Sequence, residues 1–218
     1  MTGTFHSERG RQLVHAQYRR LLDAAPLRCE ELRIPTREGE TFVLAAGAAD
    51  LPPLLLFHGG ATTSAMWLDD LPLLTQHLRV YAVDMIGEPG FSAASRPSMQ
   101  GERHALWLDD VWSALGLAGA HIAGASQGAW LALDYAARRA SRVHSLGLVA
   151  PAGITRQRIS MALRVAPLMM LGDWGRRRAV DWVMGVQAAR LPAEAQAFHD
   201  FFVLTQAHFA HRTSFIPV

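Results

Sequence analysis

The sequence predicts an α/β fold with a mostly parallel, doubly covered sheet and a helical cap. From about residue 53 onward, short unbroken apolar runs alternate with segments of helical periodicity, which is typical of parallel strands covered on both faces. An antiparallel hairpin precedes this alternation, and a long helical segment follows it. Half of the 218 residues are apolar and 18% are charged, which excludes a disordered or fibrous chain.

The first 46 residues predict a helix followed by a hairpin. Apolar residues recur at helical spacing from about Glu8 to Leu22. Cys29–Ile34 and Thr41–Ala46 have the character of strands, and the sequence TREGE between them is typical of a hairpin turn. This part of the chain is therefore expected to be antiparallel.

The next hundred residues predict parallel strands with helices between them. The strands are expected in the runs PLLLFHGG (53–60), RVYAVDMIG (79–87), AHIAGAS (120–126) and RVHSLGLVAPAG (142–153). The helices are expected from a capping Ser64 to about Leu78, over Gly101–Leu117 and over Gln127–Arg139. Strands and helices that alternate at this spacing favour a parallel sheet.

After Gly153 the alternation stops. Residues Arg156–His211 have helical character and are rich in Met, Trp and Phe. We therefore divide the chain into an incomplete α/β core over residues 1–153 and a helical cap, or lid, over residues 154–218. Most of the large side chains in the cap are expected in helix core, and a few in the wall of an apolar pocket.

The sequence Gly124-Ala125-Ser126-Gln127-Gly128 lies between a predicted buried strand and a predicted helix. A strand that reverses into a helix here forces Ser126 into a strained conformation with its hydroxyl projecting. The two glycines are expected because side chains would collide where strand and helix cross. The alternative is that Ser126 simply caps the helix.

A second motif, His58-Gly59-Gly60, follows the first parallel strand. A loop at this position supplies half of an oxyanion hole, so the backbone N–H groups of Gly60 and Gln127 are the expected donors. His58 is interpreted as a residue that orders the loop rather than as a base. Asp84, which precedes a glycine-rich loop, is interpreted as a brace for that loop.

Together these motifs resemble the α/β-hydrolase fold family, and in particular its small bacterial carboxylesterase-like members. The resemblance spans about residues 29–155 through LLLFHGGATTSAMW, VYAVDMIGEPGFS, HIAGASQGAW and RVHSLGLVAPAG. It implies that Ser126 is the nucleophile, that Gly60 and Gln127 form the oxyanion hole, and that the activity is hydrolysis of esters or related acyl compounds.

The sequence departs from that family after the cap. In the family an acid and then a histidine follow the nucleophile, each after a later strand, whereas this sequence ends at TSFIPV. We expect the catalytic acid and histidine in a segment outside these residues, such as a C-terminal fragment of the same protein that completes the sheet. The 218 residues alone would then be weak or inactive. The strand HSLGLVA (144–150) is expected to be buried on both faces.

Histidines in the cap are the remaining candidates for a base. They are His199, His208 and His211. Any of them would have to approach Ser126 to take its proton.

Composition narrows the classes of partner. All 21 basic residues are arginines, the net charge is only +2, and the run Arg176–Arg178 is interpreted as a solvated helix face, with an anion or partner contact as the alternative. Nucleic-acid binding is therefore not expected. The single cysteine, Cys29, is interpreted as a small strand residue in a cytoplasmic protein. No membrane span, metal site or cofactor is expected.

The sequence thus predicts a serine hydrolase that acts on small-molecule carboxylic esters. Two alternatives remain open. One is a non-catalytic scaffold of the same fold that binds a ligand or partner. The other keeps the nucleophile but changes the acceptor or bond, as in an acyltransferase, a perhydrolase or a hydrolase of C–C bonds.

Overall fold

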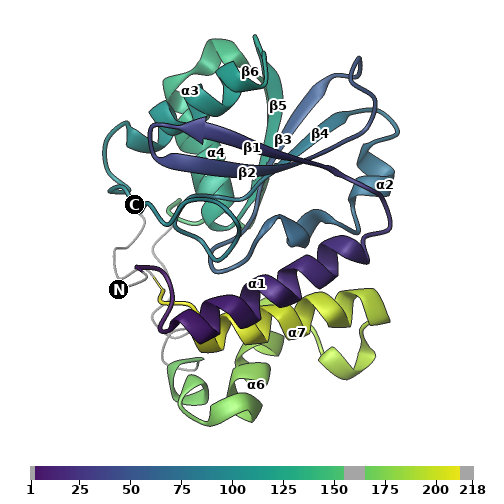
Figure 1. Cartoon of the computed structure of the whole chain (residues 1–218), viewed down its shortest axis with the longest axis vertical. Coiled ribbons are helices and arrows are strands. Elements are labelled where there is room, and N and C mark those ends of the chain that lie inside the picture. The colour runs from purple at the N-terminus through teal and green to yellow at the C-terminus, as the bar shows by residue number, and fades with distance from the viewer. Residues whose placement is uncertain (1–2, 155–164, 212–218) are drawn as a thin grey trace.

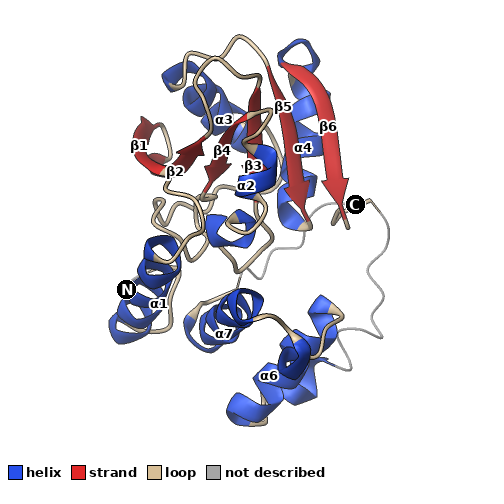
Figure 2. Cartoon of the chain, turned by 90° about the vertical axis from the view of Figure 1, so that its right-hand side faces the viewer, coloured by secondary structure: helices blue, strands red, loops and turns tan. Residues whose placement is uncertain are grey.

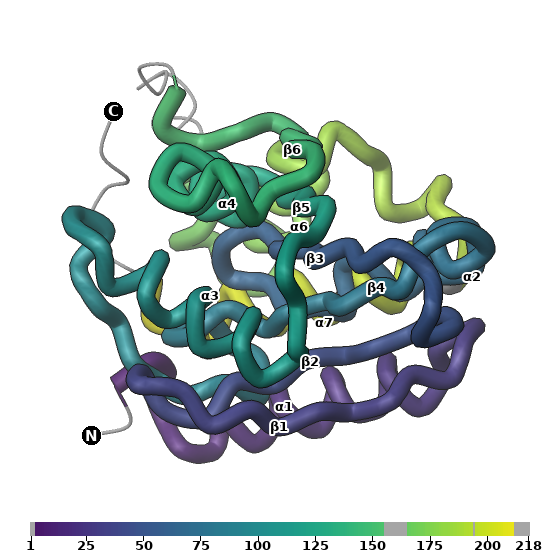
Figure 3. The backbone as a smooth tube through the Cα atoms, turned by 90° about the horizontal axis from the view of Figure 1, so that it is seen from above, coloured from purple at the N-terminus to yellow at the C-terminus, as the bar shows by residue number. Residues whose placement is uncertain are grey.

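The molecule is built on one mixed sheet. The structure, a computed structural model, describes residues 3–154 and 165–211. In these ranges six strands lie in the order β1-β2-β4-β3-β5-β6 (Figure 1 and Figure 3). β1 and β2 form the antiparallel hairpin, β2 pairs antiparallel with β4, and the other pairings are parallel. The predicted fold class is confirmed. The strands are β1 (Glu30–Thr36), β2 (Gly39–Ala46), β3 (Pro53–Phe57), β4 (Arg79–Val83), β5 (Ala120–Ala125) and β6 (Val143–Val149).

Helices cover both faces of the sheet. They are α1 (Glu8–Asp23), α2 (Leu71–Leu74), α3 (Arg103–Ala114), α4 (Gln127–Arg138), α6 (Gly172–Met184) and α7 (Ala193–His208). Ser7 caps α1, because its hydroxyl accepts a hydrogen bond from the N–H of Gly10 at 3.0 Å. The predicted helices over 8–22, 101–117 and 127–139 are confirmed within a few residues at their ends.

Two hydrophobic clusters form the core, one on each face. Alternate residues of β3 point to opposite faces: Leu55 and Phe57 pack with α3 and α4, while Leu54 and Leu56 pack with α1, α2 and α7. The first cluster contains the buried indoles of α3 and the second contains the buried rings of α1 and α7. Because β3 is covered on both sides, its carboxyl end is held in a fixed position.

The predicted helix from Ser64 to Leu78 is wrong. The segment forms a 3₁₀ turn over Ser64–Trp67 and the short helix α2. Pro72 explains the break, since a proline inside a continuous helix lacks the N–H that the ladder requires and fits best in a first turn. The capping residue also differs, because Thr63 accepts from the N–H of Ala65 while the Ser64 hydroxyl donates elsewhere.

β6 forms an edge of the sheet and is not buried on both faces as expected. Figure 2 shows β6 beside β5 at the edge of the sheet. Most of its residues are exposed, including Leu146 and Val149. β5 pairs with one edge of β6, and no strand pairs with its other edge among the residues that the structure describes. The strand itself, its parallel pairing and its place beside β5 agree with the prediction.

The cap segment packs partly into the core and partly at the surface. In α7, Phe201 is buried in the same cluster as α1, and Phe209 just beyond it is also buried. In α6, Trp174 and Trp182 are exposed. The prediction that large side chains are helix core therefore holds for α7 but not for these indoles. Met161, also among the predicted set, lies outside the described residues.

The arginine run of α6 is neutralised by neighbouring carboxylates. The three ion pairs are Arg176–Asp173, Arg177–Asp200 and Arg178–Asp181. Two of the partners lie in the same helix and one lies in α7, so the run forms a helix surface and an interhelical contact. This arrangement agrees with the interpretation of the run as a solvated face.

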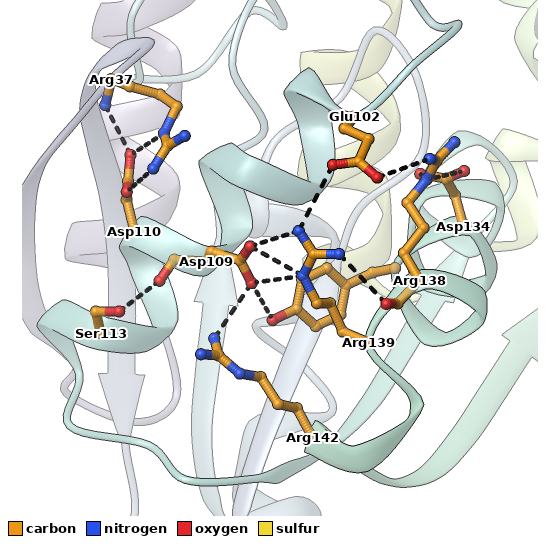
Figure 4. Close-up of polar contacts among 10 residues, drawn as sticks. Arg37, Glu102, Asp109, Asp110, Ser113, Asp134, Arg138, Arg139 and Arg142 are labelled. Atoms are coloured by element: carbon orange, nitrogen blue, oxygen red, sulfur yellow. Dashed lines mark hydrogen bonds and ion pairs between the residues drawn. The ribbon is translucent and has the colours of Figure 1, made fainter.

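An ion-pair network ties α3 to the elements around it (Figure 4). Asp109 of α3 accepts hydrogen bonds from Arg139 and Arg142, which follow α4. The carboxylate of Asp110 accepts hydrogen bonds from both the guanidinium and the backbone N–H of Arg37 in the hairpin turn. These contacts fix α3 and α4 against the sheet. In ranges 3–154 and 165–211 there is no helix long and apolar enough to cross a membrane.

Candidate active site

Ser126 occupies a sharp turn between β5 and α4. Its φ is +51° and its ψ is −111°, a region that residues with a side chain rarely adopt. Such a conformation costs about 1–3 kcal/mol and persists only where the surroundings enforce it. The predicted strained turn is therefore present in the structure.

Two glycines make this turn possible. A Cβ on Gly124 would overlap the carbonyl of Gly128, and a Cβ on Gly128 would overlap the carbonyl of Phe57 at the end of β3. The backbone of α4 thus passes directly over β5 and β3 with no side chain between them. This is the close crossing that the sequence motif predicted.

The main chain of Ser126 is anchored while its side chain is exposed. Its N–H donates to the carbonyl of Val149 in β6 at 2.9 Å, and its carbonyl accepts from the N–H groups of Trp130 and Ala152. The hydroxyl makes no capping hydrogen bond to α4. No residue in the described ranges hydrogen-bonds to Ser126 Oγ, which leaves the hydroxyl open to a ligand.

His58 orders the loop that follows β3. Its Nε2 accepts a hydrogen bond from the N–H of Met85 at 2.9 Å, so Nδ1 carries the proton and donates to the carbonyl of Gly59 at 2.7 Å. The ring is fully buried. His58 therefore holds the loop after β3 against the end of β4, as interpreted from the sequence, and both of its nitrogens are occupied.

The loop after β3 and the turn at Ser126 lie against each other. A Cβ on Gly59 would stand 3.8 Å from the Cβ of Ser126, and a Cβ on Gly60 would stand 2.6 Å from Oε1 of Gln127. The structure thus brings together the three residues that the sequence singled out, Ser126, Gly60 and Gln127. Because α4 begins at Gln127, its dipole also favours negative charge at this point.

Asp84 is the hub of a buried hydrogen-bond network beside the site. It accepts from the hydroxyl of Tyr18, from the N–H and hydroxyl of Ser64, and from the N–H of Phe91. These bonds join α1, the turn before α2 and the glycine-rich loop after β4. Burial, followed by the charge of Asp84, raises the pKa of Tyr18 well above its usual range. The structural role interpreted for Asp84 agrees with this geometry.

Sequence reasoning missed two residues near the site. Glu88 is 4% exposed and accepts hydrogen bonds from the loop after β3 and from Gln127. Thr205 of α7 contacts the carbonyl of Ala61 in the same loop at 3.1 Å. The signal for Glu88 was an acidic residue inside the loop after β4. Nothing in the sequence pointed from Thr205 to a loop 144 residues away.

The cap histidines have other partners in the structure. His199 Nε2 lies 2.9 Å from Asp181 Oδ1, so this side chain joins α7 to α6. The His208 ring packs on Gly10 of α1. Burial lowers the pKa of His211, whose ring meets that of Phe209 edge-on. None of the three forms a hydrogen bond with Ser126.

Among the described residues, neither Cys29 nor a group of metal-binding side chains offers an alternative reactive site. Cys29 lies just before β1, and burial raises the pKa of its thiol, which disfavours the reactive thiolate. In the part of the chain that the structure describes, no three His, Cys, Asp or Glu side chains are grouped to hold a metal ion. Ser126 is therefore the candidate nucleophile that the geometry favours.

Comparison with known proteins identifies the family. A sequence profile described as the alpha/beta hydrolase fold matches residues 52–215. The chain belongs to the α/β-hydrolase fold family. This match covers β3 to β6, both loops of the candidate site and the helices of the cap, and it confirms the resemblance drawn from the motifs.

Several of the similar proteins are named as carboxylesterases. The chain is 36% identical over 135 residues to an uncharacterized carboxylesterase, nap, of Bacillus subtilis, a match that covers 62% of this chain and 45% of that one. Carboxylesterase YbfK of the same organism is also 36% identical over 135 residues, with 62% and 46% covered. The crystal structure of naproxen esterase (carboxylesterase NP) from Bacillus subtilis superposes with a TM-score of 0.77 at 28% identity, covering 88% of this chain and 66% of that one. The match spans less than half the length of these curated relatives.

Proposed function

We propose that the protein hydrolyses carboxylic esters through an acyl-enzyme on Ser126. The observation that carries the proposal is an exposed hydroxyl, on a strained turn at the start of a helix, beside a glycine loop. The carboxylesterase names of the similar proteins support the same substrate class. A small-molecule ester is accordingly the proposed substrate.

In the proposed mechanism, Ser126 Oγ attacks the ester carbonyl and its proton passes to a histidine. The N–H groups of Gly60 and Gln127 donate to the tetrahedral oxyanion. As the C–O bond breaks, the same histidine gives the proton to the departing alcohol. Water, activated by that histidine, then attacks the acyl-enzyme and releases the acid.

We assign the histidine and its acidic partner to a segment outside these 218 residues, because the residues that lie outside the described ranges include no His, Asp or Glu. A further reason is local: His58 has both ring nitrogens occupied, and no described histidine hydrogen-bonds to Ser126 Oγ. In the same proposal residues 1–153 form the core that carries the nucleophile, and residues 154–218 form the cap above it.

The test is substitution of the nucleophile. In the complete protein, which includes the segment that supplies the histidine and the acid, Ser126→Ala should lower kcat for a short-chain aryl ester by several orders of magnitude, about 10⁶-fold where a complete triad operates. Ser113→Ala is the matched control, because Ser113 is an exposed serine of α3 whose hydroxyl donates only within its helix. Full activity in the Ser126→Ala protein would exclude Ser126 as the nucleophile.

A second candidate is a binding scaffold without catalysis, which the absence of a described histidine at Ser126 favours. A fluorophosphonate probe separates the two functions, because only an activated serine reacts rapidly with it. Intact mass should show one adduct on the wild-type protein and none on the Ser126→Ala variant. A wild-type protein that is folded but unlabelled would favour the scaffold.

A further inference from the structure

Glu88 joins the two sides of the candidate oxyanion hole. One carboxylate oxygen accepts from the N–H of Ala61 at 2.7 Å, and the other accepts from Nε2 of Gln127 at 3.1 Å. Ala61 directly follows Gly60, and Gln127 directly follows Ser126. A single buried side chain, from the loop after β4, therefore bridges the loop after β3 and the start of α4.

The loop after β3 needs such an anchor because its backbone is strained. Ala61 has a φ of +55°, although it is not glycine and is buried. Glu88 binds its N–H, and Thr205 of α7 contacts its carbonyl. The peptide groups on both sides of this strained residue are thus held by side chains that come from distant parts of the chain.

The same carboxylate also orients Gln127. With Nε2 directed to Glu88, the Oε1 atom of Gln127 lies against Gly60, at 2.6 Å from where a Cβ would stand. The side chain of one proposed donor residue therefore packs on the other donor residue. A carboxylate suits this position, because it offers an acceptor to each of two donors, whereas an amide would place a donor against one of them.

We propose that Glu88 is a positioning residue, which sets the distance between the backbone N–H groups of Gly60 and Gln127. This inference rests on the proposed function, since it concerns the oxyanion of the same reaction. Glu88 acts through Ala61 and Gln127 and does not contact the substrate. Donors misplaced by about 1 Å can cost about 100-fold in rate, which sets the scale of the expected effect.

The experiment compares two substrates that differ in one atom. A thionoester has sulfur in place of the carbonyl oxygen, and sulfur accepts hydrogen bonds weakly. Displaced donors should therefore slow the oxoester much more than the matching thionoester. General loss of folded enzyme would lower both rates equally and leave their ratio unchanged.

Glu88→Ala is expected to lower kcat for the oxoester by about 10- to 100-fold, with a smaller change in KM and a fall in the oxoester-to-thionoester ratio. Glu88→Gln keeps an acceptor for Ala61 and should lose about threefold to tenfold, with the ratio falling in the same direction. It provides the measurement if Glu88→Ala does not fold.

Glu38→Ala is the matched control. Glu38 is also buried and accepts hydrogen bonds from Arg103 and Ser95, but it lies in the hairpin turn, away from Ser126. This variant should lose stability and keep the wild-type substrate ratio. Folded Glu88 variants with the wild-type kcat and ratio would overturn the inference, as would equal losses on both substrates.

The proposed function is tested first, on the complete wild-type protein, which includes the segment that supplies the histidine and the acid. Wild-type protein without turnover or labelling that depends on Ser126 would overturn the proposed function, and this inference with it. Turnover that depends on Ser126 but is indifferent to Glu88 would overturn this inference alone.

Discussion

The loops after β4 and β5 begin at the same edge of the sheet, yet their polar side chains differ in burial and in hydrogen bonding. After β4, Asp84 and Glu88 are buried, and each accepts hydrogen bonds from other loops or helices. After β5, Ser126 is exposed and its hydroxyl has no described partner. The comparison shows that the loop after β4 holds its neighbours through side chains, whereas the turn after β5 is held through its main chain and leaves the Ser126 side chain exposed.

Asp84→Ala is expected to lower the free energy of unfolding more than any other change in these two loops. It would leave the Tyr18 hydroxyl and the N–H groups of Ser64 and Phe91 without their acceptor in a buried site. Stranded buried polar groups of this kind should lower the free energy of unfolding by about 3–5 kcal/mol. Urea denaturation followed by circular dichroism measures the loss.

Asp50→Ala provides the control, since Asp50 is exposed and its removal should change stability by no more than about 0.5 kcal/mol. If Asp84→Ala cannot be purified, Asp84→Asn retains one acceptor oxygen and should lose about 1–3 kcal/mol, because its amide opposes the N–H of Phe91. Wild-type stability in both Asp84 variants would mean that the loop is not held through Asp84.

High pH is expected to lower the free energy of unfolding by a smaller amount. Burial raises the pKa of Tyr135 from 10.0 to about 12, and burial with the charge of Asp84 raises that of Tyr18 as well. A folded-state pKa above the unfolded value means that the stabilisation is complete below pH 10 and is lost as the pH rises toward 12. Tyr135 alone should contribute a loss of about 1 kcal/mol by pH 11, and Tyr18 should add to it.

The chain has no lysine, so few other side chains titrate in this range. Urea denaturation at pH 9, 10 and 11 measures the decline, and tyrosinate absorbance identifies the groups. Tyr135→Phe should flatten the decline, because it removes the buried phenol. Equal stability at pH 9 and pH 11 would contradict the prediction.

The smallest effect concerns the turn at Ser126. Ser126→Gly removes the side chain from a backbone with positive φ and should raise the free energy of unfolding by about 1 kcal/mol, after the entropy cost of glycine in the unfolded chain. Ser113→Gly, in the regular helix α3, should instead lower it by about 0.5 kcal/mol. The same sign for both variants would show that Ser126 carries no strain.

Local patterns predicted much of the fold and the strained turn at Ser126. Ser126, Gly124 and Gly128 are adjacent in the chain, so their steric relation is visible in five letters. Glu88 escaped prediction because its partners lie 27 and 39 residues away. A single buried carboxylate in a loop rich in glycine has no periodicity to reveal which donors it meets.

The wrong predictions have physical causes of the same kind. Apolar periodicity from Ser64 to Leu78 resembled one helix, yet Pro72 divides it and Asp84 binds the residue that was expected to be its cap. The apolar run of β6 indicated a strand, but burial of a strand depends on its neighbours and not on its own letters. Conversely, His58 was interpreted correctly as a residue that orders its loop, because it directly follows a buried strand and precedes two glycines.

The glycine crossing has a consequence for anyone who wishes to redesign this fold. Gly124 and Gly128 let carbonyl groups, rather than side chains, determine how far α4 stands from β5 and β3. The position of Ser126 relative to the sheet is consequently independent of which apolar side chains fill the surrounding core. A mutant library that varies the neighbouring apolar residues would change which molecules can reach the serine without moving the serine itself. Both glycines would have to be kept constant in such a library.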